Sequence, residues 1–169
     1  MSIFVSYAAD DISHVNSFSK QNSELPISKR NNLWISYEKN KNEKNIEPGS
    51  DFRNEIIKAI KKSKGAVLFI SNDFLKSPFV INYELPEIFK KKKENASYKI
   101  IPVFVDRIEN FSLYPELENL HYSNTPNTSL SNLRGAQYRL TISEILNDCN
   151  SVVKSKTRLL LSSLVLLAT

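Results

Sequence analysis

Short apolar runs, separated by segments with helical periodicity, limit most strongly what this chain of 169 residues can fold into. The clearest runs are Ala66–Ile70 and Ile100–Val105; Ile3–Tyr7 is a third and Leu33–Tyr37 a weaker fourth. Strands that lack polar alternation are buried on both faces, which is typical of parallel sheets. Because helical patterns lie between the runs, the sequence predicts an α/β fold with helices on both faces of a parallel sheet. Leu120–Ser123 is a candidate fifth strand at the edge.

The clearest helical pattern is Asp51–Ser63, in which apolar side chains recur on one face and lysines gather at the end. Ser50 is expected to cap its beginning, and Gly65 is expected to end it in a left-handed conformation. A further helix is expected over Leu133–Val153.

The helix that carries Glu84 is expected to begin at Ser77-Pro78 and to run to Lys93, since proline is favoured at the first helical position. Pro86 lies inside it, removes one backbone donor and predicts a bend near Asn82. Such a bend either accommodates packing or directs the Glu84 side chain.

The net charge of +5 and the pI near 9.2 raise the question of nucleic-acid binding. The lysines cluster at Lys39–Lys44, Lys58–Lys64 and Lys90–Lys93, mostly beside expected helix ends, where the helix dipole favours cations. We therefore favour solvated helix ends over an anion-binding patch. No zinc-finger, basic-zipper or RNP-type signature accompanies the charge, so nucleic acid is not an expected partner.

Several other classes of site find no support in the sequence. Three glycines cannot build a dinucleotide-binding or P-loop motif. His14 and His121 are isolated, so no metal site is expected. Cys149, the single cysteine, lies among apolar residues and is expected in the core rather than as a nucleophile. One cysteine and the absence of a signal peptide predict a cytoplasmic protein.

Residues 154–169 form an apolar tail that is expected to be helical, separate from a domain over residues 1–153. The ten residues Leu159–Ala168 contain only two serines as polar residues, but a membrane-spanning helix needs about 20 apolar residues. We favour docking on the same domain or self-association. Contact with a membrane surface, or a reading frame that once continued into another domain, is the less favoured alternative.

Four segments resemble the TIR domain family, bacterial branch, over roughly Ser2–Val153. In order, they are Ile3-Phe4-Val5-Ser6-Tyr7 with Asp10 and Asp11; Trp34–Glu38 with a polar loop to Pro48-Gly49; Ser63–Ser77 with Tyr83-Glu84-Leu85; and Lys99–Asp106. The resemblance implies a flavodoxin-like open parallel sheet of four to five strands in the order 2-1-3-4-5. Two features depart from the enzymatic members. Val80, next to Phe79, stands where a tryptophan is frequent, and Ala8 and Ala9 stand where some members carry arginines.

In open parallel sheets, ligands bind outside the carboxyl ends of the strands where the strand order reverses. This rule selects residues 6–11, Tyr37 with the loop after it, and residues 71–84. The resemblance makes Glu84 the catalytic residue. The candidate substrate-binding residues are Ser6, Tyr7, Asp10, Tyr37, Ser71, Phe79 and Val80.

The activity that the resemblance implies is cleavage of the nicotinamide–ribose bond of NAD⁺, with or without cyclisation of ADP-ribose. Nicotinamide leaves as a neutral base, so a single carboxylate that stabilises positive charge at the ribose can suffice. The alternative for Glu84 is a structural salt bridge with a lysine. In the enzymatic interpretation NAD⁺ is the substrate, and no cofactor is expected.

The resemblance also implies a role in bacterial immunity, often against phage, or in depletion of NAD⁺. Activity is expected to depend on self-assembly through the loop Glu38–Pro48. The alternative function is a non-enzymatic scaffold that recruits other TIR domains, which the departures at Val80, Ala8 and Ala9 favour slightly.

Overall fold

The computed structural model describes the backbone of residues 2–36 and 51–166 and the side chains of residues 2–36 and 52–151. Tyr37, the loop Glu38–Pro48 and the expected cap Ser50 lie outside the described residues.

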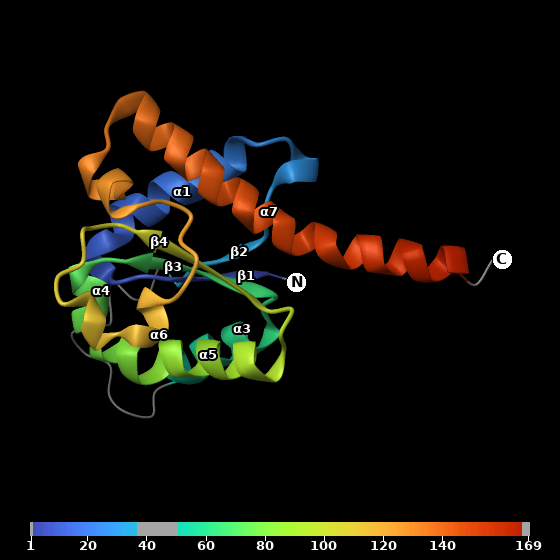
Figure 1. Ribbon diagram of the computed structural model, residues 1–169, viewed down its shortest axis with the longest axis horizontal. Helices are drawn as coiled ribbons and strands as arrows, with labels where there is room; N and C mark the ends of the chain where they lie inside the picture. Colours follow the sequence, from blue (N-terminus) through green and yellow to red (C-terminus); the bar gives the residue numbers. More distant parts are fainter. Residues whose placement is uncertain (1, 37–50, 167–169) are drawn as a thin grey trace.

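Four parallel strands form one sheet in the order β2-β1-β3-β4 (Figure 1). Their bounds are β1 Ile3–Ser6, β2 Leu33–Trp34, β3 Gly65–Ile70 and β4 Lys99–Phe104. Ile3 lies between Leu33 and Gly65, and Gly65 pairs in turn with Lys99. The predicted strands and the predicted order of the first four are confirmed.

The prediction of a fifth strand over Leu120–Ser123 was wrong, because Pro102 and the side chain of Asn124 prevent a further strand from pairing along the outer edge of β4. Ser123 donates its backbone N–H to the Pro102 carbonyl at 3.0 Å, but Pro102 has no N–H with which to continue a ladder. One step along, the side chain of Asn124 takes the place of a strand. Its Oδ1 accepts from the Phe104 N–H at 2.7 Å, and its Nδ2 donates to the Phe104 carbonyl at 2.8 Å.

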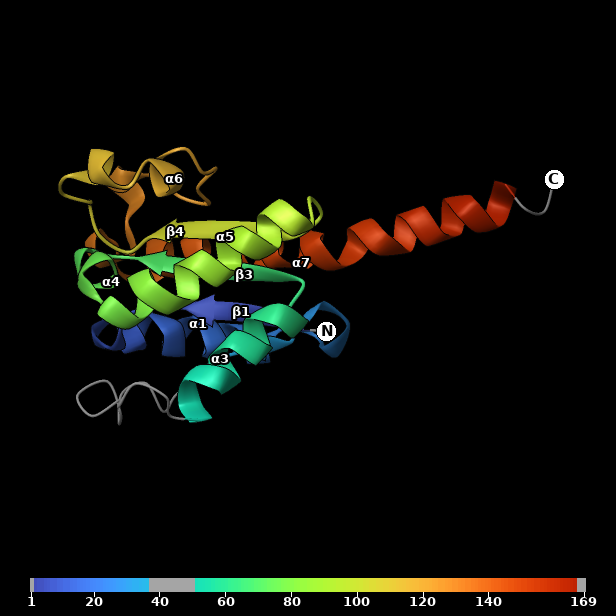
Figure 2. The ribbon, with the colours of Figure 1, turned by 90° about the horizontal axis from the view of Figure 1, so that it is seen from below.

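Helices cover both faces of the sheet, as predicted. Figure 1 shows α1 (Ile12–Glu24) and α7 (Gly135–Leu166) on one face, and α3 (Asp51–Lys62) and α5 (Leu85–Glu94) on the other. Figure 2 shows β1, β3 and β4 in sequence, with α3 and α5 crossing them. The two faces hold separate cores, because successive strand side chains point to opposite sides. The strand residues that face α1 and α7 are Ile3, Val5, Val67, Phe69, Ile101 and Val103, and Tyr7, directly after β1, packs with them. The strand residues that face α3 and α5 are Phe4, Ala66, Leu68, Ile70 and Phe104.

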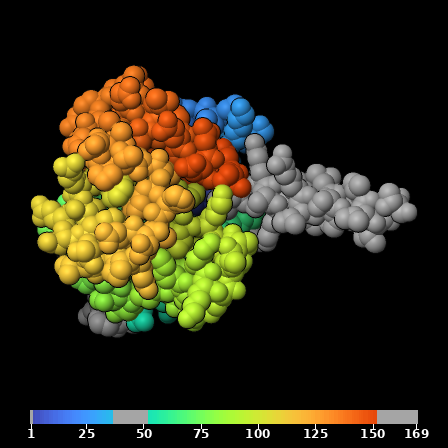
Figure 3. Space-filling view, viewed as in Figure 1, coloured from blue at the N-terminus to red at the C-terminus, as the bar shows by residue number. Residues whose placement is uncertain are grey.

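The remaining described elements are short. They are α4 (Asn72–Lys76), α6 (Pro115–Glu118), a π turn (Val80–Glu84) and the 3-10 turns Ala9–Asp11, Ile27–Lys29, Phe111–Leu113, Pro126–Thr128 and Leu130–Asn132. In the space-filling view, the segment from residue 107 to 134, yellow to orange, lies over the β4 edge between α5 and α7 (Figure 3).

Helix α7 begins at Gly135, two residues later than expected, and crosses residue 153 without a break. Its backbone extends beyond the other elements in Figures 1 and 2. No helix in the part of the chain that the structure describes has the length and apolar character needed to cross a bilayer. The division at residue 153 stays a prediction.

Cys149 is buried on the inner side of α7, and burial raises the pKa of its thiol to about 12, so its expected place in the core is confirmed.

The end of α3 is capped by a side chain from α5 rather than by glycine. Gly65 is the first residue of β3 and does not adopt the expected left-handed conformation. Instead, the Lys91 ammonium group donates to the carbonyls of Ile60, at 3.0 Å, and Ser63, at 2.5 Å, and also to that of Lys61. Those carbonyls need donors from outside the helix, and a cation there also interacts favourably with the helix dipole.

Lys91→Met is expected to lower the free energy of unfolding by about 1–3 kcal/mol, because hydrogen bonds to a charged group are lost while the apolar stem remains. Urea unfolding would measure the change. Lys90→Met, an exposed neighbour, is the matched control and should change stability by less than about 0.5 kcal/mol. Equal stability of the two variants would show that Lys91 does not cap α3.

Candidate active site

Glu84 ends a π turn that spans Val80–Glu84 and leads directly into α5. The backbone N–H of Leu85 bonds to the carbonyl of Val80, five residues earlier. A wider helical turn therefore stands where the sequence predicted a bend, and the bend itself stays a prediction. This turn relieves the contact that the ring of Pro86 would make with the carbonyl four residues before it.

The Glu84 side chain is 0 % exposed and lies against the carboxyl end of β1. Ser6, the last residue of β1, donates its hydroxyl to Oε2 of Glu84. Ser6 and Phe4 are two residues apart in β1, so both side chains point to the same face of the sheet. That face holds α3, α5 and the π turn. Sequence reasoning placed Glu84 at the border of a buried face, whereas the structure buries it completely.

Phe79 and Val80 have different surroundings, although they are adjacent. Val80 is completely buried in the core between the sheet and α3 and α5. The ring of Phe79 lies 5.7 Å from that of Phe52 and 5.4 Å from that of Tyr83, measured between centroids. Beyond them, the guanidinium carbon of Arg53 lies 4.2 Å from the Tyr83 ring centroid.

Tyr7 and Ser71 lie on the opposite face of the sheet from Glu84, the face covered by α1. Tyr7 donates its hydroxyl to the Ser36 carbonyl at 2.6 Å, which ties β1 to the segment after β2. Ser71 follows β3, accepts from the Phe74 N–H at 2.9 Å and so caps α4. Its hydroxyl also donates to Oδ2 of Asp11 at 2.5 Å.

Asp11, rather than the expected Asp10, has its side chain inside the molecule at this edge. Asp10 is exposed, whereas Asp11 is 7 % exposed. Burial raises the pKa of Asp11 to about 7, which outweighs the opposing effect of the Ser71 hydrogen bond. The negative charges of Asp106, Asp73 and Asp10 raise it further.

His14 lies near these carboxylates but does not complete a metal site. Its Nδ1 lies 2.8 Å from the Tyr138 hydroxyl, and burial lowers the pKa of its imidazole. Among the described residues, no group of three or more His, Cys, Asp or Glu side chains is arranged to hold a metal ion.

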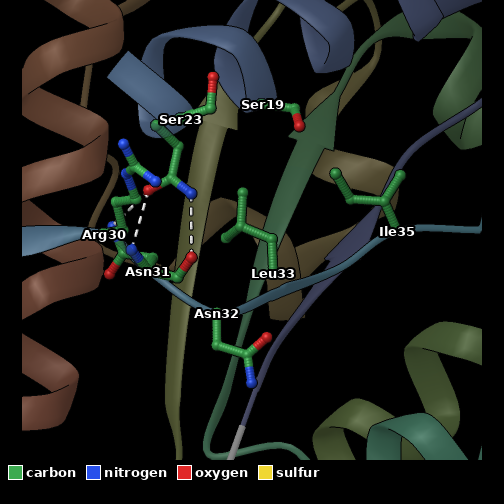
Figure 4. A pocket seen from close by; sticks show the side chains of 8 residues that line it. Ser19, Ser23, Arg30, Asn31, Asn32, Leu33 and Ile35 are labelled. Carbon is green, nitrogen blue, oxygen red and sulfur yellow. Dashed lines mark hydrogen bonds between the residues drawn. The ribbon is translucent and has the colours of Figure 1, made fainter. Parts of the chain in front are cut away.

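A separate recess of about 340 Å³ lies at the amino ends of the strands, between α1 and the segment that enters β2 (Figure 4). Asn22 of α1 and Asn31 pair there through two hydrogen bonds of 2.9 Å, which fix the start of β2. Because the recess lies at the edge of the sheet opposite to Glu84, it is not part of the candidate site.

The carboxyl edge of the sheet therefore carries two clusters, one on each face. Ser6, Glu84, Phe79 and Val80 lie on the α3 and α5 face, and Tyr7 and Ser71 lie on the α1 face. Sequence reasoning selected the segment that contains Asp11 but chose Asp10 as the binding residue, and it missed Arg53.

A comparison with protein-family models matches residues 3–134 to the family described as TIR domain. The chain belongs to the TIR domain family. The match includes all four strands of the TIR sheet, the π turn and Glu84. A search of curated proteins finds no match to this TIR domain. Its placement in the bacterial branch stays a prediction from the sequence.

Proposed function

We propose that this TIR domain cleaves the nicotinamide–ribose bond of NAD⁺, with Glu84 as the essential carboxylate. The observation that carries the proposal is the buried Glu84 side chain, fixed by Ser6 at the carboxyl end of β1. A carboxyl group is costly to bury. Its presence at the edge where open α/β sheets bind ligands therefore indicates a functional role for Glu84.

The chemistry needs few groups from the protein. When the C1′–N bond breaks, its electron pair goes to the pyridinium nitrogen, and nicotinamide leaves as a neutral molecule. Positive charge then develops on the ribose ring, and a fixed carboxylate beside it lowers the energy of the transition state. Water adds to C1′ and releases a proton to solvent; attack by an atom of the ADP-ribose moiety instead would give a cyclic product.

The biological setting follows from the same proposal. We expect depletion of NAD⁺ in bacterial immunity, and activation when copies of the domain assemble through the loop Glu38–Pro48. That loop lies outside the described residues, so this part rests on the family relationship.

The direct test is to incubate the purified protein with NAD⁺ and to measure free nicotinamide by chromatography. The assay is run over a range of protein concentrations and with a crowding agent. Nicotinamide release that rises more than linearly with protein concentration is the expected result. A folded, assembled protein that releases none would overturn the proposal.

The alternative is a TIR scaffold without enzymatic activity. Val80 favours it, because enzymatic members often have a tryptophan at that position. A scaffold would assemble in the same assay and leave NAD⁺ intact.

A further inference from the structure

Arg53 and Tyr83 form a cationic and aromatic pair between the first turn of α3 and the π turn. The guanidinium carbon lies 4.2 Å from the centre of the Tyr83 ring, and both side chains are half-buried. Among the side chains that the structure describes, no carboxylate pairs with Arg53. A guanidinium that lies over a ring still has N–H donors directed outward in its own plane, where they suit a bidentate oxyanion.

The pair is held in a fixed relation to Glu84. Tyr83 directly precedes Glu84 in the π turn and contacts Phe79, which contacts Phe52 of α3. This series of ring contacts joins the first turn of α3 to the turn that carries the carboxyl group. Arg53 of α3 therefore contacts Tyr83, the residue directly before Glu84, on the face of the sheet that α3 and α5 cover.

The charges at this edge of the sheet differ between its two faces. On the α1 face, Asp11 lies close enough to Asp106, Asp73 and Asp10 for their charges to raise its pKa. A phosphate group there would meet the same repulsion. The turn after β1 offers no cation either, since Ala8 and Ala9 stand there. Arg53 is on the other face, away from these carboxylates.

We propose that Arg53, braced by Tyr83, binds the diphosphate of the dinucleotide whose nicotinamide ribose lies at Glu84. The inference rests on the proposed function and names the part of the substrate that the site recognises. NAD⁺ carries a positive pyridinium ribose and a negative diphosphate, so a site that orients it needs a carboxylate for one and a cation for the other. Charge-assisted hydrogen bonds from a guanidinium to phosphate oxygens supply the second contact.

The test compares Arg53→Gln with the wild type in two measurements. Nicotinamide release from NAD⁺ should show a KM at least about 10-fold higher in the variant, with kcat within about two-fold, because uniform binding is lost. Calorimetry with ADP-ribose, which keeps the diphosphate, should show a similar loss of affinity. Adenosine, which lacks phosphate, should bind both proteins equally. Arg53→Lys should recover part of the affinity, since it restores the charge without the fork of donors.

Lys58→Gln is the matched control, because it removes an exposed cation from the same helix. It should leave KM and ADP-ribose affinity unchanged. If Arg53→Gln binds ADP-ribose as tightly as the wild type, the diphosphate assignment is overturned whether or not the wild type is active. If the wild type binds ADP-ribose through Arg53 but releases no nicotinamide, the proposed reaction fails and the anion site stands.

Discussion

Glu84→Gln is expected to lower the rate of nicotinamide release from NAD⁺ by at least about 10²–10³-fold, the size of effect that follows loss of one fixed electrostatic group. Glutamine has nearly the same shape, and its Oε1 can still accept the hydrogen bond from Ser6. The substitution therefore removes the negative charge while it keeps the packing of the π turn. Stability should fall by less than about 1.5 kcal/mol or rise, because a buried carboxylate no longer has to be desolvated.

Initial rates at saturating NAD⁺, together with thermal unfolding, separate loss of chemistry from loss of fold. Glu87→Gln is the matched control: Glu87 lies in the first turn of α5, three residues beyond Glu84, and is only partly buried. It should keep wild-type activity. Equal rates for the wild type and Glu84→Gln would remove Glu84 from the mechanism and leave the scaffold as the better account of the domain.

The fold could be predicted because burial on both faces leaves a signature in each strand separately. Ala66–Ile70 and Ile100–Val105 contain no polar residue, and β3 and β4 form over nearly the same residues. Edges were harder to predict. The short β2 stops at Trp34, and the expected strand Leu120–Ser123 fails because Pro102 and the side chain of Asn124 already determine the β4 edge.

The candidate site could be predicted only where residues lie at strand ends or beside a helix breaker. Ser6 ends a buried strand, and Pro86 indicated that the helix around Glu84 would not be regular. The contacts of Lys91 with the end of α3 and of Arg53 with Tyr83 join residues about 30 positions apart. No local pattern marks such contacts, because they depend on how two helices lie against each other.

The choice between Asp10 and Asp11 shows the same limit at shorter range. Both follow β1, where the family resemblance predicts acidic residues. The 3-10 turn Ala9–Asp11 directs one side chain inward and the other outward, and its geometry is not encoded by residue type at either position.

Asp11→Asn is expected to stabilise the protein at pH 8 by on the order of 2–4 kcal/mol and to have little effect near pH 4. The pKa of Asp11 is raised from 3.8 to about 7 in the folded protein, chiefly by burial. The folded state therefore holds a proton that the unfolded state has lost between about pH 4 and pH 7, so stability falls as the pH rises through this range. Each pKa unit is worth about 1.4 kcal/mol, which sets the size of the effect. Asparagine cannot ionise, and its Oδ1 can still accept from Ser71.

The measurement is the free energy of unfolding of both proteins in urea from pH 4 to pH 9. Two features identify Asp11 as the cause of the difference. First, burial lowers the pKa of His14, and this shift makes stability rise with pH, opposite to the effect of Asp11. Both proteins contain His14, so its effect cancels in the comparison. Second, Asp10→Asn removes the exposed neighbouring carboxylate and should reproduce only a small part of the change. A difference between wild type and Asp11→Asn that stays constant across the pH range would mean that Asp11 does not retain its proton in the folded protein. Asp11 would then be an ionised carboxylate that accepts a hydrogen bond from Ser71, the N-cap of α4.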